Sequence, residues 1–156
     1  MPEVLLKKVQ AARRYGQGFA TVEFLASAFF DMAVHSLANP GDIDVAALQA
    51  RELAAIGMPE AILPRHGAPH FQHVFSGEGY SAGYYSYLWS EVLDADGFEA
   101  FVETGDAFDP ALAARLKRFI YSAGNSRPPE EAYSLFRGRA PHPDALLRKR
   151  GFAELR

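Results

Sequence analysis

Hydrophobic residues recur at helical spacing along most of the 156-residue chain. Over residues 19–37, apolar side chains cover so much of a helix that we expect burial on more than one side. Residues 2–14 have the pattern of a shorter amphipathic helix, with Leu5 and Val9 on its apolar side and basic residues opposite. No stretch shows the strict alternation that is typical of a strand. The pattern therefore predicts an all-α chain.

Proline, glycine and capping residues divide this pattern into separate helices. Asp44 offers a carboxylate to cap one helix, and Asp109 precedes a first-turn proline at the start of another. Gly97 is expected to interrupt the helical pattern around it. The length suits one irregular multi-helix domain over residues 1–156. The expected helices cover residues 2–14, 19–37, 45–56, 80–95, 98–104, 109–122, 128–138 and 144–150, with an irregular connection over residues 58–70.

The composition excludes several classes of protein. Apolar residues make up 49% and charged residues 22% of the chain, as in ordinary globular proteins. The formal charge of −3 is spread along the chain without a basic stripe, so we expect no nucleic-acid partner. The chain has no cysteine, no apolar run long enough for a membrane span and no apolar signal region. We expect a cytoplasmic protein without a membrane partner.

Residues 71–89 are the most distinctive stretch of the chain. His73 precedes Gly77 and Gly79, whose backbones can turn freely and let a ligand come close. Tyr80 and Tyr87 lie seven residues apart, about two turns of a helix, so their hydroxyls would emerge on one side of it. The pattern predicts a mobile loop that carries a histidine, followed by a helix that presents a column of phenols.

This stretch resembles the C-terminal region of the thimet-oligopeptidase-like zinc peptidases, of the peptidyl-dipeptidase and oligopeptidase A type. The resemblance covers nearly the whole chain and implies the C-terminal part of a larger helical metallopeptidase catalytic domain. The residues and ranges that carry it are His73, the Gly77/Gly79 loop, Tyr80 and residues 83–89, continuing through residues 17–23, 91–98, 136–139 and 146–151.

The resemblance also implies roles for these residues. Tyr80 and Tyr87 match the family's two active-site tyrosines, which stabilise the oxyanion formed during peptide hydrolysis. His73 is expected to bind the substrate, and the Gly77/Gly79 loop is expected to flex over a bound peptide, with Glu78 as an insertion in it. Tyr84, Tyr85 and Trp89 have the helical spacing of packing residues.

A zinc peptidase of this family needs a helix with His-Glu-x-x-His and a further glutamate. The chain lacks this motif: His66 and His70 are four apart, but Gly67 and Pro69 lie between them. His70 and His73 stay open as an alternative pair of ligands. Glu23 is not assigned, because its match follows the family's metal ligands. We therefore expect zinc in the intact enzyme, none bound to this chain and no hydrolysis by the chain alone.

Other candidate residues have more ordinary interpretations. His35, among apolar neighbours, is expected in a core or an interface, and His142, between prolines, is expected in solvent. Two interpretations of Arg137 and Arg139 remain open. They bind a peptide carboxylate, or they are cations that stabilise the C-terminus of a helix. The basic residues 148–150 are expected to form a solvated helix end.

Three hypotheses follow for the function. The first is the C-terminal portion of a zinc oligopeptidase that acts on short peptides, seen as a fragment, an engineered piece or one product of a split gene. Its partners would be peptide substrates and the missing N-terminal catalytic segment, or a second copy by self-association. The second is a non-catalytic helical module that binds peptides or a partner protein. The third is a structural module whose apolar second helix forms an oligomer interface.

Overall fold

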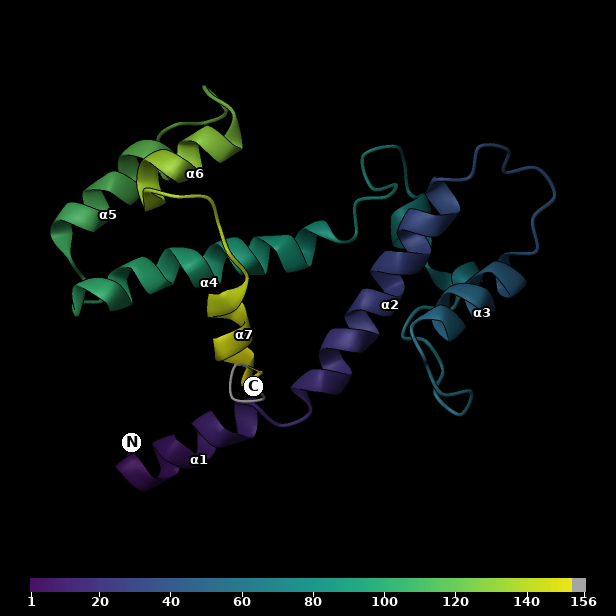
Figure 1. The fold of residues 1–156 in the computed structure, drawn as a ribbon, viewed down its shortest axis with the longest axis horizontal. Helices are drawn as coiled ribbons and strands as arrows, with labels where there is room; N and C mark the ends of the chain where they lie inside the picture. The colour runs from purple at the N-terminus through teal and green to yellow at the C-terminus, as the bar shows by residue number, and fades with distance from the viewer. Residues whose placement is uncertain (153–156) are drawn as a thin grey trace. The chain divides into compact units, whose positions relative to one another are not determined.

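The computed structural model describes residues 1–152, which form helices and connecting turns without any strand (Figure 1). The predicted all-α class is confirmed. The described residues form two compact units, one of residues 15–87 and one of residues 1–14 with residues 88–152. The prediction of one domain over residues 1–156 stays a prediction.

The unit of residues 15–87 is built on two packed helices, α2 (Gln17–His35) and α3 (Val45–Ala55). The carboxylate of Asp44 caps α3 by accepting the Ala47 N–H at 3.0 Å, as the sequence predicts. Two short 3-10 turns follow, η1 (Ala68–His70) and η2 (Gln72–Phe75). Their side chains complete a core formed by Phe30, Leu48, Ala68, Phe71 and Val74.

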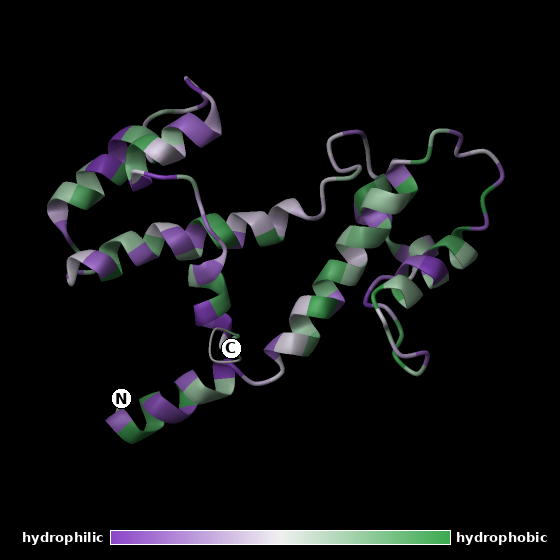
Figure 2. Cartoon of the chain, viewed as in Figure 1, coloured by the Kyte–Doolittle hydropathy of each residue, from purple (hydrophilic) through white to green (hydrophobic). Residues whose placement is uncertain are grey.

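The apolar character of α2 extends along most of its length (Figure 2). Ala26, Ala28 and Phe30 are buried, whereas Phe19 and Phe29 are about half exposed. Ala26 and Ala28 lie on opposite sides of the helix, so burial on more than one side is confirmed for the middle of α2. Phe19 and Phe29 still present apolar surface to solvent.

The helix predicted over residues 80–95 begins later than expected. Residues 80–85 form successive turns, which we call the tyrosine turn, and α4 (Ser86–Thr104) starts only after them. Ala82 has a left-handed backbone, with φ at +55°, which no helix accommodates. The predicted interruption at Gly97 is also wrong, because α4 runs through it and Phe136 packs over the glycine.

The other unit contains the remaining helices, α1 (Glu3–Arg13), α5 (Pro110–Leu116), α6 (Pro129–Arg137) and α7 (Asp144–Arg150). The helix predicted over residues 109–122 is divided, because α5 passes into a π-helical turn, η3 (Lys117–Tyr121). Asp109 caps α5 by accepting the Leu112 N–H at 2.8 Å. The main core of this unit joins α4, α5 and α6 through Ala100, Phe101, Leu112, Tyr133 and Phe136.

The two ends of this unit differ in how they are packed. Ala145 and Leu146 of α7 pack on Val92 and Ala95 of α4, and the predicted bounds of α7 are confirmed. The predicted helix at the N-terminus is confirmed as α1, but it buries none of its residues. None of the helices in residues 1–152 has the length and apolar run needed to cross a bilayer.

Candidate functional site

His73, Tyr80 and Tyr87 come together within the unit of residues 15–87. His73 lies in η2, and its Nε2 is 3.0 Å from the hydroxyl oxygen of Tyr87. The ring of Tyr80 meets the His73 ring edge to face, with centroids 4.8 Å apart. Tyr80 and Tyr87 are 49% and 50% exposed, so a ligand can reach both rings. Tyr80 and Tyr87 thus come near His73 because of the tyrosine turn, and not because they share one face of a helix as predicted.

Tyr84 lies in a layer of aromatic rings next to His73 and Tyr87. It stacks on Phe24, with ring centroids 5.0 Å apart, and meets Phe71 edge to face at the same separation. Its hydroxyl is 3.4 Å from Nε2 of His66. Tyr84 is thus a packing residue, as its spacing predicts, and it supports Tyr87 through an edge-to-face contact at 5.5 Å.

His66 and Tyr84 of this layer are neutral near pH 7, because the shifts of their pKa values favour the uncharged forms. Burial lowers the pKa of His66, and the nearby Arg65 charge lowers it further, against an opposing effect of Glu23. Burial also raises the pKa of the Tyr84 phenol. Tyr87 therefore packs against an uncharged Tyr84, whose hydroxyl lies near an uncharged His66.

Asp31 holds the tyrosine turn in place from α2, and sequence reasoning missed it. Its carboxylate is fully buried and accepts the backbone N–H of Ala82 at 3.0 Å and of Tyr84 at 2.9 Å. Its Oδ1 also lies 2.8 Å from Nδ1 of His35. His35 is partly buried in this contact, which agrees with the core position that was one of its two predicted places. The signal in the sequence was an acidic residue one helical turn before a histidine on an apolar helix.

The glycine loop between His73 and Tyr80 is open to solvent. Gly77 has φ at +146°, a backbone conformation that favours glycine. A Cβ atom at Gly77 or Gly79 would meet no other atom within 4 Å. The loop is joined to the tyrosine turn by the Tyr80 N–H, which donates to the Gly77 carbonyl at 3.0 Å. Room for a ligand exists here, and the flexing of the loop stays a prediction.

The metal donors within the described part of the chain do not gather into a zinc site. Within residues 1–152, no three His, Asp or Glu side chains gather where they could hold a metal ion. His66 stacks on Phe71 with ring centroids 4.4 Å apart, and Glu23 lies 3.9 Å from Arg65. Both side chains thus take part in packing or ion pairing within their own unit.

Arg137 and Arg139 bind carboxylates of their own unit. Arg139 donates to Asp96 at 2.5 Å, and Arg137 donates to Glu103 at 2.8 Å. Tyr133 donates to the same Asp96 at 2.7 Å. Their observed partners are thus internal. His142 is mostly exposed and pairs with Asp144, which agrees with its predicted place in solvent.

The sequence predicts that the basic end of α7 is solvated, but its side chains form ion pairs with α4. Arg148 lies 2.7 Å from Glu99, Lys149 lies 3.3 Å from Asp94, and Arg150 lies 2.5 Å from Glu91. All three partners belong to α4. These ion pairs join α7 to α4. Because each pair has an exposed member, each contributes little to the free energy of unfolding.

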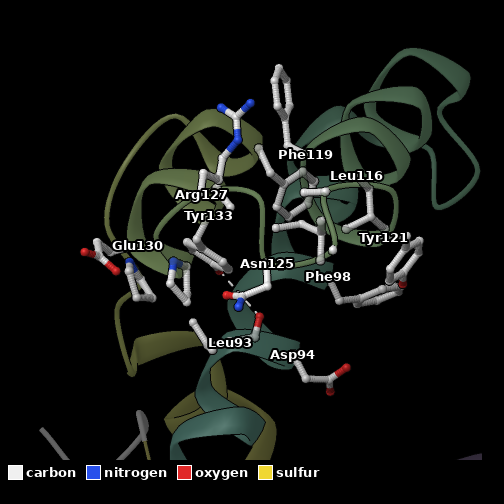
Figure 3. A pocket seen from close by; sticks show the side chains of 18 of the residues that line it. Leu93, Asp94, Phe98, Leu116, Phe119, Tyr121, Asn125, Arg127, Glu130 and Tyr133 are labelled. Atoms are coloured by element: carbon white, nitrogen blue, oxygen red, sulfur yellow. Dashed lines mark hydrogen bonds between the residues drawn. The ribbon is translucent and has the colours of Figure 1, made fainter.

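A cavity of about 750 Å³ lies in the unit of residues 1–14 and 88–152. Figure 3 shows many of its side chains, which come from α4, the end of α5, η3, α6 and the loops on either side of α6. Its lining is mainly apolar, and the Tyr133 hydroxyl oxygen, whose hydrogen is donated to Asp96, lies 3.4 Å from the Leu93 carbonyl oxygen on one side. None of the residues predicted to form the peptide site lines it.

Comparison with known proteins identifies the family. The sequence model that describes peptidase family M3 matches residues 1–152. The chain belongs to peptidase family M3. This M3 chain is 39% identical to the dipeptidyl carboxypeptidase of Escherichia coli K12 and 37% identical to the oligopeptidase A of the same organism. It is 30% identical to a thimet-like oligopeptidase of Dictyostelium discoideum.

Each of these matches covers 97% of this chain but only 22% of the relative. The chain therefore spans about a fifth of the length of the curated relatives it matches. The resemblance stated from the sequence is confirmed at the level of the family.

Proposed function

We propose that this M3 chain supplies the substrate side of a peptidase active site. Tyr80 and Tyr87 would stabilise the oxyanion, and His73 with the Gly77/Gly79 loop would hold the peptide. The observation that carries the proposal is the half-exposed group formed by Tyr80, His73 and Tyr87, with 3.0 Å between His73 Nε2 and the Tyr87 hydroxyl.

The chemistry of this group suits a developing negative charge. Attack on a peptide carbonyl places the charge on its oxygen, and a phenol is a neutral donor at pH 7. In the tautomer with a hydrogen on Nε2, His73 donates to the Tyr87 oxygen. The hydrogen of Tyr87 is then free to point at the oxyanion. Tyr80, whose ring contacts the His73 ring, can supply a second donor.

The metal ligands of the active enzyme would come from another polypeptide segment, since no described cluster of this chain fits zinc. Short peptides are the proposed substrates, and a location in the cytoplasm stays a prediction. We expect the chain alone to be inactive.

The test is peptide hydrolysis with added zinc, by the chain alone and mixed with a polypeptide that carries the His-Glu-x-x-His segment of an M3 relative. Activity is expected only in the mixture. Tyr87→Phe or Tyr80→Phe should lower kcat by about 10²- to 10³-fold, the typical cost of one oxyanion donor. Tyr85→Phe is the matched control, because Tyr85 is exposed in the same turn, and it should leave kcat unchanged.

Two results would contradict this proposal. Hydrolysis by the chain alone would point back to His70 and His73 as metal ligands. If the mixture shows no hydrolysis although the chain is folded, the alternative is favoured, a non-catalytic peptide-binding or oligomerisation module. The accessible rings of Tyr80 and Tyr87 support peptide binding in that case too, and chemical shifts of His73 on addition of peptide to the chain alone would measure it.

A further inference from the structure

Asp31 contacts the backbone of the tyrosine turn but not the hydroxyls of Tyr80 or Tyr87. We propose that it is a positioning residue of the peptidase site, which fixes the turn that presents these two phenols. The inference rests on the proposed function of the tyrosines for its catalytic meaning. The contacts themselves are independent of that function.

The carboxylate of Asp31 satisfies two backbone N–H donors of the tyrosine turn. The N–H of Ala82 donates to Oδ1 at 3.0 Å and the N–H of Tyr84 donates to Oδ2 at 2.9 Å. Hydrogen bonds to an ionised acceptor are stronger than neutral ones, and burial of Asp31 excludes competing water. They offset the cost of the left-handed backbone at Ala82. The turn therefore keeps its shape because of a residue on α2.

His35 connects the same carboxylate to the segment that carries His73. Its Nδ1 lies 2.8 Å from Oδ1 of Asp31 and 3.0 Å from the Asp31 carbonyl oxygen. Both the ionised carboxylate and the carbonyl only accept, so Nδ1 carries the hydrogen. The His35 ring also contacts Phe75 of η2, with centroids 5.2 Å apart. The Asp31–His35 pair thus supports both η2 and the tyrosine turn.

The alignment of the site depends on this pair. Tyr80 lies two residues before Ala82, and Tyr87 lies three residues after Tyr84, so rotation of the turn moves both phenols relative to His73. Oxyanion donors act only when they are held at the position of the developing charge. Loss of Asp31 should therefore damage catalysis without removing any group that touches the substrate.

The first experiment uses the chain alone and needs no activity. Asp31→Asn keeps the size of the side chain but leaves one of the two N–H donors without an oxygen. Amide hydrogen exchange at Ala82 or Tyr84, measured by NMR, should become about ten- to a hundredfold faster. The contact between the His73 and Tyr80 rings should weaken. The amide of Leu48, in the core of the same unit, should keep its exchange rate.

Asp44→Ala is the matched control, because Asp44 also accepts a backbone N–H in this unit. It should speed exchange at Ala47 and leave Ala82 and Tyr84 unchanged. Unchanged exchange at both turn residues in Asp31→Asn would overturn the proposal. Equal acceleration at Leu48 would also overturn it, since Asp31 would then support only the whole unit.

His35→Gln provides a second variant in case Asp31→Asn does not fold. It retains the carboxylate and removes the ring contact with Phe75. It should speed exchange at Ala82 several-fold without affecting Leu48, and the absence of any change would overturn the role of the pair.

The catalytic meaning is tested in the mixture with the metal-bearing segment. Asp31→Asn should lower kcat with little change in KM. It should cost less in a Tyr87→Phe background, since misplacement of the Tyr87 hydroxyl has no effect once that hydroxyl is absent. Equal costs in both backgrounds would overturn the positioning role. An inactive wild-type mixture would refute the proposed function while the exchange result for Asp31 still stands.

Discussion

Ala82 occupies a backbone conformation that is unusual for its residue type. Its φ of +55° brings its Cβ close to the backbone, a cost that glycine avoids. The residue is retained in this conformation by its N–H bond to Asp31. The effect of a glycine here should therefore differ in sign from its effect in a helix.

Ala82→Gly should leave the free energy of unfolding unchanged or raise it by up to about 1 kcal/mol, because relief of strain offsets the entropy of glycine. Ala50→Gly is the control, since Ala50 is exposed in the middle of α3 and should lose about 1 kcal/mol. Denaturant unfolding measures both. A loss at Ala82 as large as that at Ala50 would contradict the left-handed assignment.

His66 links the stability of the chain to pH at the scale of one residue. Its pKa is lowered by burial first and by Arg65 second, so the unfolded chain binds a proton more readily than the folded chain. The stabilising contribution of neutral His66 is fully present above the unfolded pKa of about 6.5. It is lost as the pH falls from there through the folded pKa.

His66→Phe should therefore reduce the loss of stability between about pH 7.5 and about pH 5.5. His142→Phe is the control, because His142 is mostly exposed and should leave that loss as in the wild type. Thermal unfolding at a series of pH values measures the difference. An identical pH dependence in wild type and His66→Phe would show that His66 is not the coupled group.

At the scale of helices, a buried carboxylate joins α4 to α6. Asp96 accepts hydrogen bonds from Tyr133 of α6 and from Arg139 just beyond it, and Arg137 donates to its backbone carbonyl. Burial alone would raise the pKa of Asp96, but the hydrogen bonds from Arg139 and Tyr133 and the two arginine charges outweigh it and lower the pKa. The ionised form thus holds the end of α6 on α4.

Asp96→Asn should lower the free energy of unfolding by about 3–5 kcal/mol, because it leaves buried donors and charge without their partner. Glu103→Gln is the matched control: Glu103 pairs with the same Arg137 but is about half exposed, so its loss should cost less than about 1 kcal/mol. Urea unfolding of both variants tests this. Equal costs would mean that burial of the pair does not decide its strength.

At the scale of the whole chain, apolar surface remains uncovered. Val4, Leu5 and Val9 of α1 are 66%, 51% and 42% exposed, and Phe29 on α2 is 46% exposed. Exposed apolar surface of this kind favours association with another polypeptide. Relatives several times longer than this chain have additional chain that could cover such surface. Self-association is the alternative in its absence.

The isolated chain should therefore associate as its concentration rises, as measured by sedimentation velocity. Leu5→Glu combined with Val9→Glu should weaken this association by removing apolar contact area. Lys8→Glu is the control, because it changes charge on α1 without removing an apolar side chain. A monomer at every concentration would contradict the prediction and favour the stand-alone binding module.

Local signals in the sequence predicted much of the fold. Helical spacing, the caps Asp44 and Asp109 and the prolines placed most helices correctly, because these signals act within a few residues of each other. The start of α4 was wrong, since the side chain that competes for its first N–H groups lies 51 residues before Ala82. The break expected at Gly97 was also wrong, because packing of Phe136 over α4 outweighs a weak local preference.

The sequence by itself determined the helical class, the family resemblance and the identity of His73, Tyr80 and Tyr87 as candidates, because residue type and local spacing carry this information. The tertiary structure alone decided how these side chains meet. Their approach depends on hydrogen bonds that the Asp31 carboxylate accepts from backbone N–H groups more than fifty positions away, which no local pattern encodes. For the same reason, the sequence did not indicate the partner of Arg139, which is the carboxylate of Asp96, 43 residues away on α4.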